Sequence, residues 1–183
     1  MILYQSILGD AKFLELLTRS DEAMAELTRE AGCACGGVLH RAAYDRKPRG
    51  MGSLGSVRRA SFCCAEEGCR RRATPPSLVF LGRRVFFGVV VLLVSALRQA
   101  PSRQTLAELE TRYGITQRTL LRWRKWWQET FVTSSVWRAA QGLFDTPVKT
   151  ADLPGSLLEA FDDKVEAVLR FLSPLSAVRR QTA

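Results

Sequence analysis

The chain carries five cysteines, all between residues 33 and 69, and they fall into two clusters. The first cluster reads Gly32-Cys33-Ala34-Cys35-Gly36-Gly37, and the second reads Cys63-Cys64-Ala65-Glu66-Glu67-Gly68-Cys69. A structural zinc ion takes four soft ligands such as thiolates, and each short cysteine pair can supply two of them from one tight turn. Glycines beside the first pair suit such a turn, because glycine readily adopts positive φ. The spacing therefore predicts a Zn²⁺ site held by Cys33, Cys35, Cys64 and Cys69.

The ligand assignment leaves alternatives open. The first pair has one intervening residue where zinc knuckles usually have two. Cys63 and Cys64 are both candidates for the third ligand, with Cys69 as the last. His40, the single histidine, can replace a cysteine, although a lone histidine more often lies at the surface. Buried free cysteines are a further alternative, and the odd number of cysteines disfavours a disulfide framework.

The composition indicates a folded protein with an acidic partner. The chain has 183 residues, of which 46% are hydrophobic and 25% charged, and these values argue against disorder over most of its length. Its 27 Lys and Arg residues against 18 Asp and Glu give a net charge of +9, which favours nucleic acid or an anionic membrane as partner.

The longest apolar run, residues 85–97, is too short to span a bilayer, which needs about 20 apolar residues. It is expected to be a buried helix or strand. The N-terminus shows no basic region followed by an apolar stretch, so we expect no signal peptide. Together with free thiols, these features predict a cytoplasmic protein without membrane attachment.

Sequence patterns divide the chain into four segments. Apolar residues at helical spacing predict helix over residues 2–31, with Ser20 or Asp21 as the cap of a second helix. The apolar face of residues 155–172 predicts a further helix that either closes the core or pairs with a second copy. The expected organisation is an N-terminal helical segment (1–31), a zinc-ribbon-like segment (32–77), a helix-turn-helix domain (78–140) and a C-terminal helix and tail (141–183).

A helix-turn-helix pattern covers residues 105–127. Gly114 is placed to end the first helix in a left-handed conformation, and Thr116 is placed to cap the second. The side chains expected to pack the two helices together are Leu109, Tyr113, Ile115, Leu120 and Trp123. The pattern has two departures, because Glu110 stands where a small residue is usual and Leu121 lies near the outward face. An ordinary basic amphipathic hairpin is the alternative interpretation.

Two sets of residues are predicted to contact DNA. A recognition helix presents side chains from its first turns to base edges in the major groove. Runs of arginine and lysine neutralise phosphates without reading sequence. The predicted helix contacts are Thr116, Gln117, Arg118, Thr119, Arg122 and Lys125, and the predicted phosphate contacts are Arg70, Arg71, Arg72, Arg46, Lys47 and Arg49.

The order of these motifs resembles the N-terminal half of zinc-ribbon insertion-sequence transposases. In that family a ribbon precedes a turn containing threonine, a hydrophobic helix and a helix-turn-helix, whose motif corresponds here to Gly114-Ile115-Thr116-Gln117-Arg118-Thr119. The chain is also similar to short bacterial proteins that carry the pieces RKPRG (46–50), TPPS (74–77) and RWRKWW (122–127). The resemblance covers roughly residues 30–130 and implies DNA binding.

The resemblance does not extend to catalysis. Such transposases cut DNA with three carboxylates on a separate domain that binds two divalent metal ions. Only about 50 residues follow Phe131, and no strand pattern brings their carboxylates together. We therefore expect no enzymatic activity.

The sequence thus predicts a mostly α fold with a small β zinc ribbon and a helix-turn-helix core. The expected function is non-catalytic binding of double-stranded DNA, as an accessory or regulator related to transposases. Its expected protein partners are a second copy or a recombinase. The alternative is a protein-interaction subunit of a larger recombination or nucleic-acid-processing complex.

Overall fold

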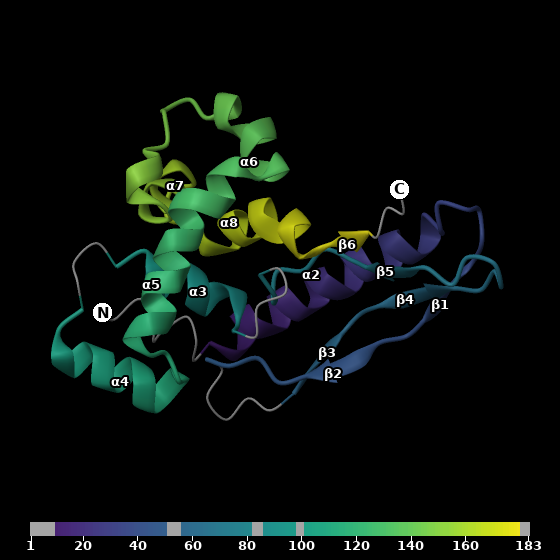
Figure 1. Cartoon of the computed structure of the whole chain (residues 1–183), viewed down its shortest axis with the longest axis horizontal. Coiled ribbons are helices and arrows are strands. Elements are labelled where there is room, and N and C mark those ends of the chain that lie inside the picture. The colour runs from purple at the N-terminus through teal and green to yellow at the C-terminus, as the bar shows by residue number, and fades with distance from the viewer. Residues whose placement is uncertain (1–9, 51–55, 82–85, 98–100, 180–183) are drawn as a thin grey trace.

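The computed structural model describes residues 10–50, 56–81, 86–97 and 101–179 (Figure 1). The fold is mostly helical with a small antiparallel sheet, as predicted. The helices are α2 (Ala11–Glu30), α3 (Gly88–Ser95), α4 (Arg103–Tyr113), α5 (Gln117–Lys125), α6 (Ser135–Ala140), α7 (Gly155–Ala160) and α8 (Val165–Leu172). The strands are β1 (Leu39–Arg41), β2 (Tyr44–Arg46), β3 (Val57–Arg59), β4 (Phe62–Cys64), β5 (Arg72–Thr74) and β6 (Val178–Arg179).

Helix α2 is one continuous helix, so the expectation of a second helix capped by Ser20 or Asp21 is wrong. The Asp10 carboxylate caps its N-terminus by accepting hydrogen bonds from the backbone N–H groups of Lys12 and Phe13, at 2.9 and 3.2 Å. The Asp21 carboxylate instead accepts hydrogen bonds from the Ser77 hydroxyl and from the backbone N–H of Leu78. Asp21 therefore ties the middle of α2 to the start of the helical core.

A long antiparallel ribbon runs beside α2. Strand β1 pairs with β4, and β2 pairs with β3 in a separate two-stranded sheet that follows in the same register: Leu39 lies opposite Cys64, and Tyr44 lies opposite Arg59. Strand β5 extends the sheet beyond β4, and the C-terminal strand β6 pairs with β5. The last described residues of the chain thus return to the ribbon.

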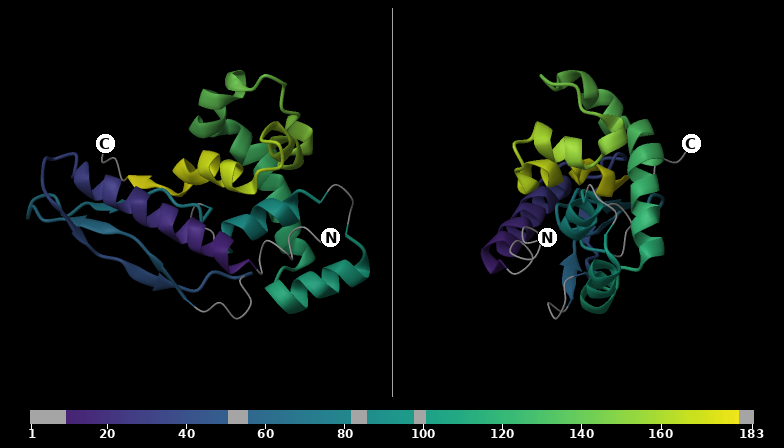
Figure 2. Two further views of the ribbon diagram at one scale, coloured as in Figure 1. Left: turned by 180° about the vertical axis from the view of Figure 1, so that it is seen from behind. Right: turned by 90° about the vertical axis from the view of Figure 1, so that its left-hand side faces the viewer.

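The hydrophobic core is centred on α3. Every residue of this helix is buried, which confirms the expectation that the apolar run forms a buried element; residues 82–85 and 98–100 lie outside the described part. Helices α5 and α8 contact α3, and the Phe86 and Trp123 rings meet edge to face with centroids 4.9 Å apart. Figure 2 shows α2 (purple) and α5 (green) on opposite sides of the molecule, with α3 between them.

The C-terminal segment closes this core. Leu157, Val168 and Leu172 are buried in the cluster that contains α3. In the described part of the chain, no helix is long and apolar enough to cross a membrane.

Candidate metal centre

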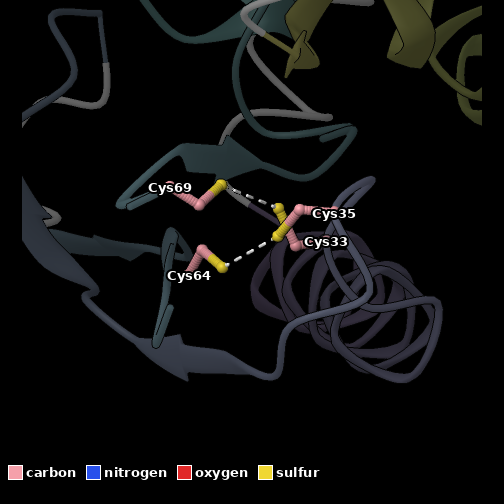
Figure 3. A group of neighbouring side chains, drawn as sticks. All are labelled: Cys33, Cys35, Cys64 and Cys69. Atoms are coloured by element: carbon pink, nitrogen blue, oxygen red, sulfur yellow. Dashed lines mark hydrogen bonds between the residues drawn. The ribbon is translucent and has the colours of Figure 1, made fainter. Parts of the chain in front are cut away.

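Four cysteines from two separate segments bring their sulfur atoms together at the end of the ribbon. Cys33 and Cys35 follow α2, Cys64 ends β4, and Cys69 lies in the turn that leads to β5. The four Sγ atoms all lie within 4.8 Å of one another. Figure 3 shows the four side chains pointing toward one common point between the two segments.

The first pair is positioned by the way α2 ends. Gly32 adopts a left-handed conformation (φ 68°), which turns the chain out of the helix. The following loop is closed by hydrogen bonds from the backbone N–H of Cys33 to the carbonyl of Gly37 (3.0 Å) and from the N–H of Gly36 to the carbonyl of Cys33 (2.8 Å). Gly36 has φ 85°, a conformation that side chains other than glycine rarely adopt.

The second pair is positioned by the turn between β4 and β5. The backbone N–H of Cys64 donates to the carbonyl of Arg71 (2.9 Å), and the N–H of Cys69 donates to the carbonyl of Glu66 (3.0 Å). The backbone N–H of Ala65 donates to the carbonyl of Val38 (2.9 Å), which holds this turn against the loop of the first pair. Main-chain hydrogen bonds therefore fix both segments.

The sulfur positions fit a four-coordinate metal. The Sγ atoms of Cys33 and Cys69 are 3.6 Å apart, and those of Cys35 and Cys64 are 3.5 Å apart. Tetrahedral coordination with metal–sulfur distances of about 2.3 Å places sulfur atoms about 3.8 Å from one another. All five cysteines are free thiols, so the sulfur atoms approach without forming disulfides. The four cysteines are close enough to bind one metal ion.

The structure decides between Cys63 and Cys64. Neighbouring residues on a strand point to opposite faces, and Cys64 is the one that lies among the four sulfur atoms. The Sγ atom of Cys63 instead lies 3.6 Å from the carbonyl oxygen of Arg70. His40 stands opposite Cys63 in the sheet and is exposed, so it lies outside the cluster too.

Backbone hydrogen-bond donors lower the pKa of these thiols, and burial raises it. The backbone N–H of Gly37, followed by the neighbouring thiols, lowers the pKa of Cys35 to about 7. Burial raises the pKa of Cys64 to about 12, because a thiolate loses its hydration there. At neutral pH the exposed Cys35 thiol is therefore partly ionised, whereas the buried Cys64 thiol stays protonated until a cation arrives.

Gly37 lies against the cluster and leaves room for the sulfur atoms. A β-carbon at this position would lie 2.8 Å from the Sγ of Cys64 and 2.5 Å from the Cγ of Glu66. Because Cys64 is fully buried, its sulfur cannot move away easily. A side chain at position 37 would therefore overlap with the Sγ atom of Cys64, one of the four candidate ligands.

The predicted DNA-contacting residues lie in two separate places. Gly114 ends α4 with φ 65°, and the Thr116 hydroxyl caps α5 by accepting from the N–H of Thr119 at 3.3 Å. Four predicted contacts on α5 are exposed: Gln117, Arg118, Arg122 and Lys125. Thr119 is buried, and its hydroxyl lies 3.1 Å from that of Thr116, so this residue supports the cap.

The basic runs lie at opposite ends of the ribbon. Arg70, Arg71 and Arg72 are exposed near the metal centre. The Arg49 carbonyl accepts a hydrogen bond from the N–H of Phe87 (2.9 Å), which attaches the other run, Arg46 to Arg49, to the helical core. The structure therefore does not gather the basic residues into one patch.

Two residues that the sequence did not single out position the ribbon. Arg59 is almost fully buried and donates from one guanidinium nitrogen to the carbonyl oxygens of Pro75 (2.7 Å) and Ser176 (3.2 Å). Arg41 forms an ion pair with Glu26 and joins β1 to α2. The alternation of side chains along a strand would have shown which face Arg59 and Arg41 occupy only if the pairing register of the strands had been known.

No protein-family model matches the chain, and the searches of curated proteins and of solved structures gave no significant match.

Proposed function

We propose that the chain is a non-catalytic DNA-binding protein, an accessory or regulator related to insertion-sequence transposases. In this proposal a Zn²⁺ ion holds the ribbon to α2, and α5 contacts double-stranded DNA as the recognition helix of a helix-turn-helix. The sequence resemblance supports the family relationship, and the four-thiolate cluster supports zinc, since sets of four cysteines are typical of structural zinc sites.

One observation carries the DNA-binding proposal: α5 is buried on one face and exposes cations on the other. Leu120 and Trp123 are buried in the core, whereas Arg118 and Arg122 are exposed. The N-terminal turn of such a helix can enter the major groove, where arginine reads guanine. Leu121, which is 57% exposed, would contact a thymine methyl group from the same face.

The charge on α5 supports the same orientation. Exposed Glu15, Glu22 and Glu30 on α2 are balanced by exposed Lys12, Arg19 and Arg29. Helix α5 has exposed cations and no carboxylate, so the side that bears α5 would face the DNA. The two basic runs would then contact phosphates beyond the helix.

A binding titration tests this function. Arg118→Ala is expected to weaken binding to a selected duplex by about 1–3 kcal/mol and to relax sequence preference. Arg19→Ala is the matched control, because Arg19 is an exposed cation on α2 that pairs with Glu15 at 2.6 Å. Affinity of the native protein should fall steeply with salt as counterions are released.

Equal affinity of the native protein, Arg118→Ala and Arg19→Ala for duplex DNA would reject α5 as the recognition helix. If the native protein does not bind duplex DNA at any salt concentration, the alternative function as a protein-interaction subunit takes its place.

A further inference from the structure

A cavity of about 450 Å³ lies between helix α2 and the ribbon that runs beside it (Figure 1). Residues 18, 21, 22, 25 and 26 of α2 line one wall, and their spacing places them on a single face of the helix. Residues 41–43 and 57–62 of the ribbon contribute to the other wall. Small-molecule sites in proteins usually have volumes of about 300–1,000 Å³. The cavity is therefore large enough to hold a small ligand.

The interior of the cavity is apolar. Ala25, Phe62 and Val79 line it and are buried. Ala60, two residues before Phe62, packs against the same cluster and also lines the cavity, as does Ala43. The alanine methyl groups leave space between the helix and the ribbon that larger side chains would fill. This space suits an aliphatic group of a ligand.

Two exposed residues of opposite charge belong to the same lining. Glu22 lies on α2 and Arg58 lies on β3. Side chains alternate along a strand, so Arg58 shares with Ala60 the face of the ribbon that is directed at α2. In the part of the chain that the structure describes, Glu22 and Arg58 form no hydrogen bond or ion pair, either with each other or with another residue.

The other charged residues of the lining already have partners. The Asp21 carboxylate accepts hydrogen bonds from the start of the helical core, and Glu26 forms an ion pair with Arg41. The Arg59 guanidinium donates to two carbonyl oxygens of residues that do not line the cavity. One carboxylate and one guanidinium, on opposite walls, therefore remain available to a ligand.

We propose that this cavity binds a free amino acid with an apolar side chain. The ammonium group of the ligand donates to the Glu22 carboxylate, and its carboxylate accepts from the Arg58 guanidinium, which can form two parallel hydrogen bonds with a carboxylate. The ligand side chain enters the apolar interior beside Ala25 and Phe62. The site is separate from the DNA-binding surface proposed above, because none of these residues belongs to α5 or to the two basic runs.

The pair of opposite charges decides the class of ligand. A free amino acid carries an ammonium group, a carboxylate and one side chain on a single small molecule. The end of a peptide carries one of the two charges, as does a simple amine or a carboxylic acid. Each of these molecules would leave either Glu22 or Arg58 without a partner and would bind more weakly.

Isothermal titration calorimetry of the full chain with L-leucine tests the proposal. We expect one leucine per chain, with a dissociation constant below about 1 mM. Leucinamide lacks the carboxylate and N-acetyl-leucine lacks the ammonium group, so each should bind at least about tenfold more weakly. Absence of saturable leucine binding up to about 10 mM would overturn the proposal. Leucinamide that binds as tightly as leucine would overturn it too.

Variants connect each charge of the ligand to its partner in the protein. Arg58→Ala is expected to lower the affinity for leucine about tenfold and to leave that for leucinamide unchanged, because leucinamide has no carboxylate to lose contact with. Glu22→Gln should lower the affinity for leucine and leave that for N-acetyl-leucine unchanged. Arg19→Ala is the matched control, because Arg19 is an exposed cation of α2 outside the cavity and pairs with Glu15. It should change the affinity for leucine less than about threefold.

A variant that fills the interior tests the location of the site. Ala60→Leu places a larger side chain in the space between the ribbon and α2 and should abolish leucine binding. An unchanged affinity in Ala60→Leu, or equal losses from Arg58→Ala and Arg19→Ala, would overturn the cavity as the binding site. Thermal unfolding of each variant without ligand confirms that it is folded.

Discussion

The Sγ atom of Cys35 lies 3.5 Å from the Sγ atom of Cys64, although the two residues are 29 positions apart in the chain. One belongs to the loop after α2 and the other to the end of β4. A metal ion held between them joins the helix to the sheet, so we expect loss of the ion to loosen this end of the ribbon.

Cys64→Ser is expected to abolish tight metal binding, and Cys69→Ser should do the same, because each removes a ligand. Cys63→Ser should retain one metal ion per chain, since the Cys63 sulfur lies outside the cluster and near the carbonyl of Arg70. Metal analysis of the three purified variants measures the difference. Equal loss of metal from Cys63→Ser and Cys64→Ser would show that the ligand set is wrong.

Gly37→Ala is expected to weaken metal binding by at least about tenfold, since the added β-carbon would lie 2.8 Å from the buried sulfur of Cys64. Gly68→Ala is the matched control: its β-carbon would meet no atom within 4 Å, and Gly68 lies in the same turn as Cys69. Competition with a chromogenic chelator gives both affinities. If the two variants bind metal equally well, Gly37 does not border the ion.

Metal affinity should increase with pH. Burial raises the pKa of Cys64 to about 12. For Cys69, the N–H of Arg71 lowers the pKa, but burial and neighbouring thiols outweigh it, and the pKa is raised. Both thiols are therefore protonated at neutral pH in the metal-free protein, and binding must release these protons. The affinity should rise about tenfold per pH unit for each proton released, and metal should be lost as pH falls. An affinity that stays constant from about pH 6 to about pH 8 would contradict this proton release.

Arg59→Ala is expected to lower the free energy of unfolding by about 3 kcal/mol, because it leaves the carbonyl oxygens of Pro75 and Ser176 without their charged donor in a buried place. Arg58→Ala removes the neighbouring exposed arginine and should change the free energy by less than about 0.5 kcal/mol. Urea unfolding of the two variants provides the comparison. Equal stability would mean that Arg59 does not hold the ribbon to the C-terminal segment.

Much of the candidate site could be predicted from local sequence, because ligand type and short spacing are local properties. Cys33, Cys35 and Cys69 are the candidates that clustering alone identifies. The choice of Cys64 over Cys63 could not be made from the sequence, since it depends on which face of β4 packs against α2. That face is set by the pairing of Cys64 with Leu39, a contact between strands that no local pattern specifies.

The fold shows the same division between local and long-range information. The buried helix α3 and the turn at Gly114 follow from an apolar run and from a glycine with positive φ. The pairing of β6 with β5 and the burial of Arg59 depend on residues more than 100 positions away, as the hydrogen bond from Arg59 to Ser176 (117 positions) illustrates. Local sequence patterns carry no signal for contacts between residues so far apart in the chain.

The most direct test of the account is native mass spectrometry of protein purified without chelator, combined with counting of reactive thiols. The account predicts one zinc ion per chain, with Cys63 as the thiol that reacts most readily while the metal is bound. After the metal is removed by a chelator, all five thiols should react. A chain that carries no metal, and whose five thiols all react at once in the native state, would contradict the metal centre on which the account depends.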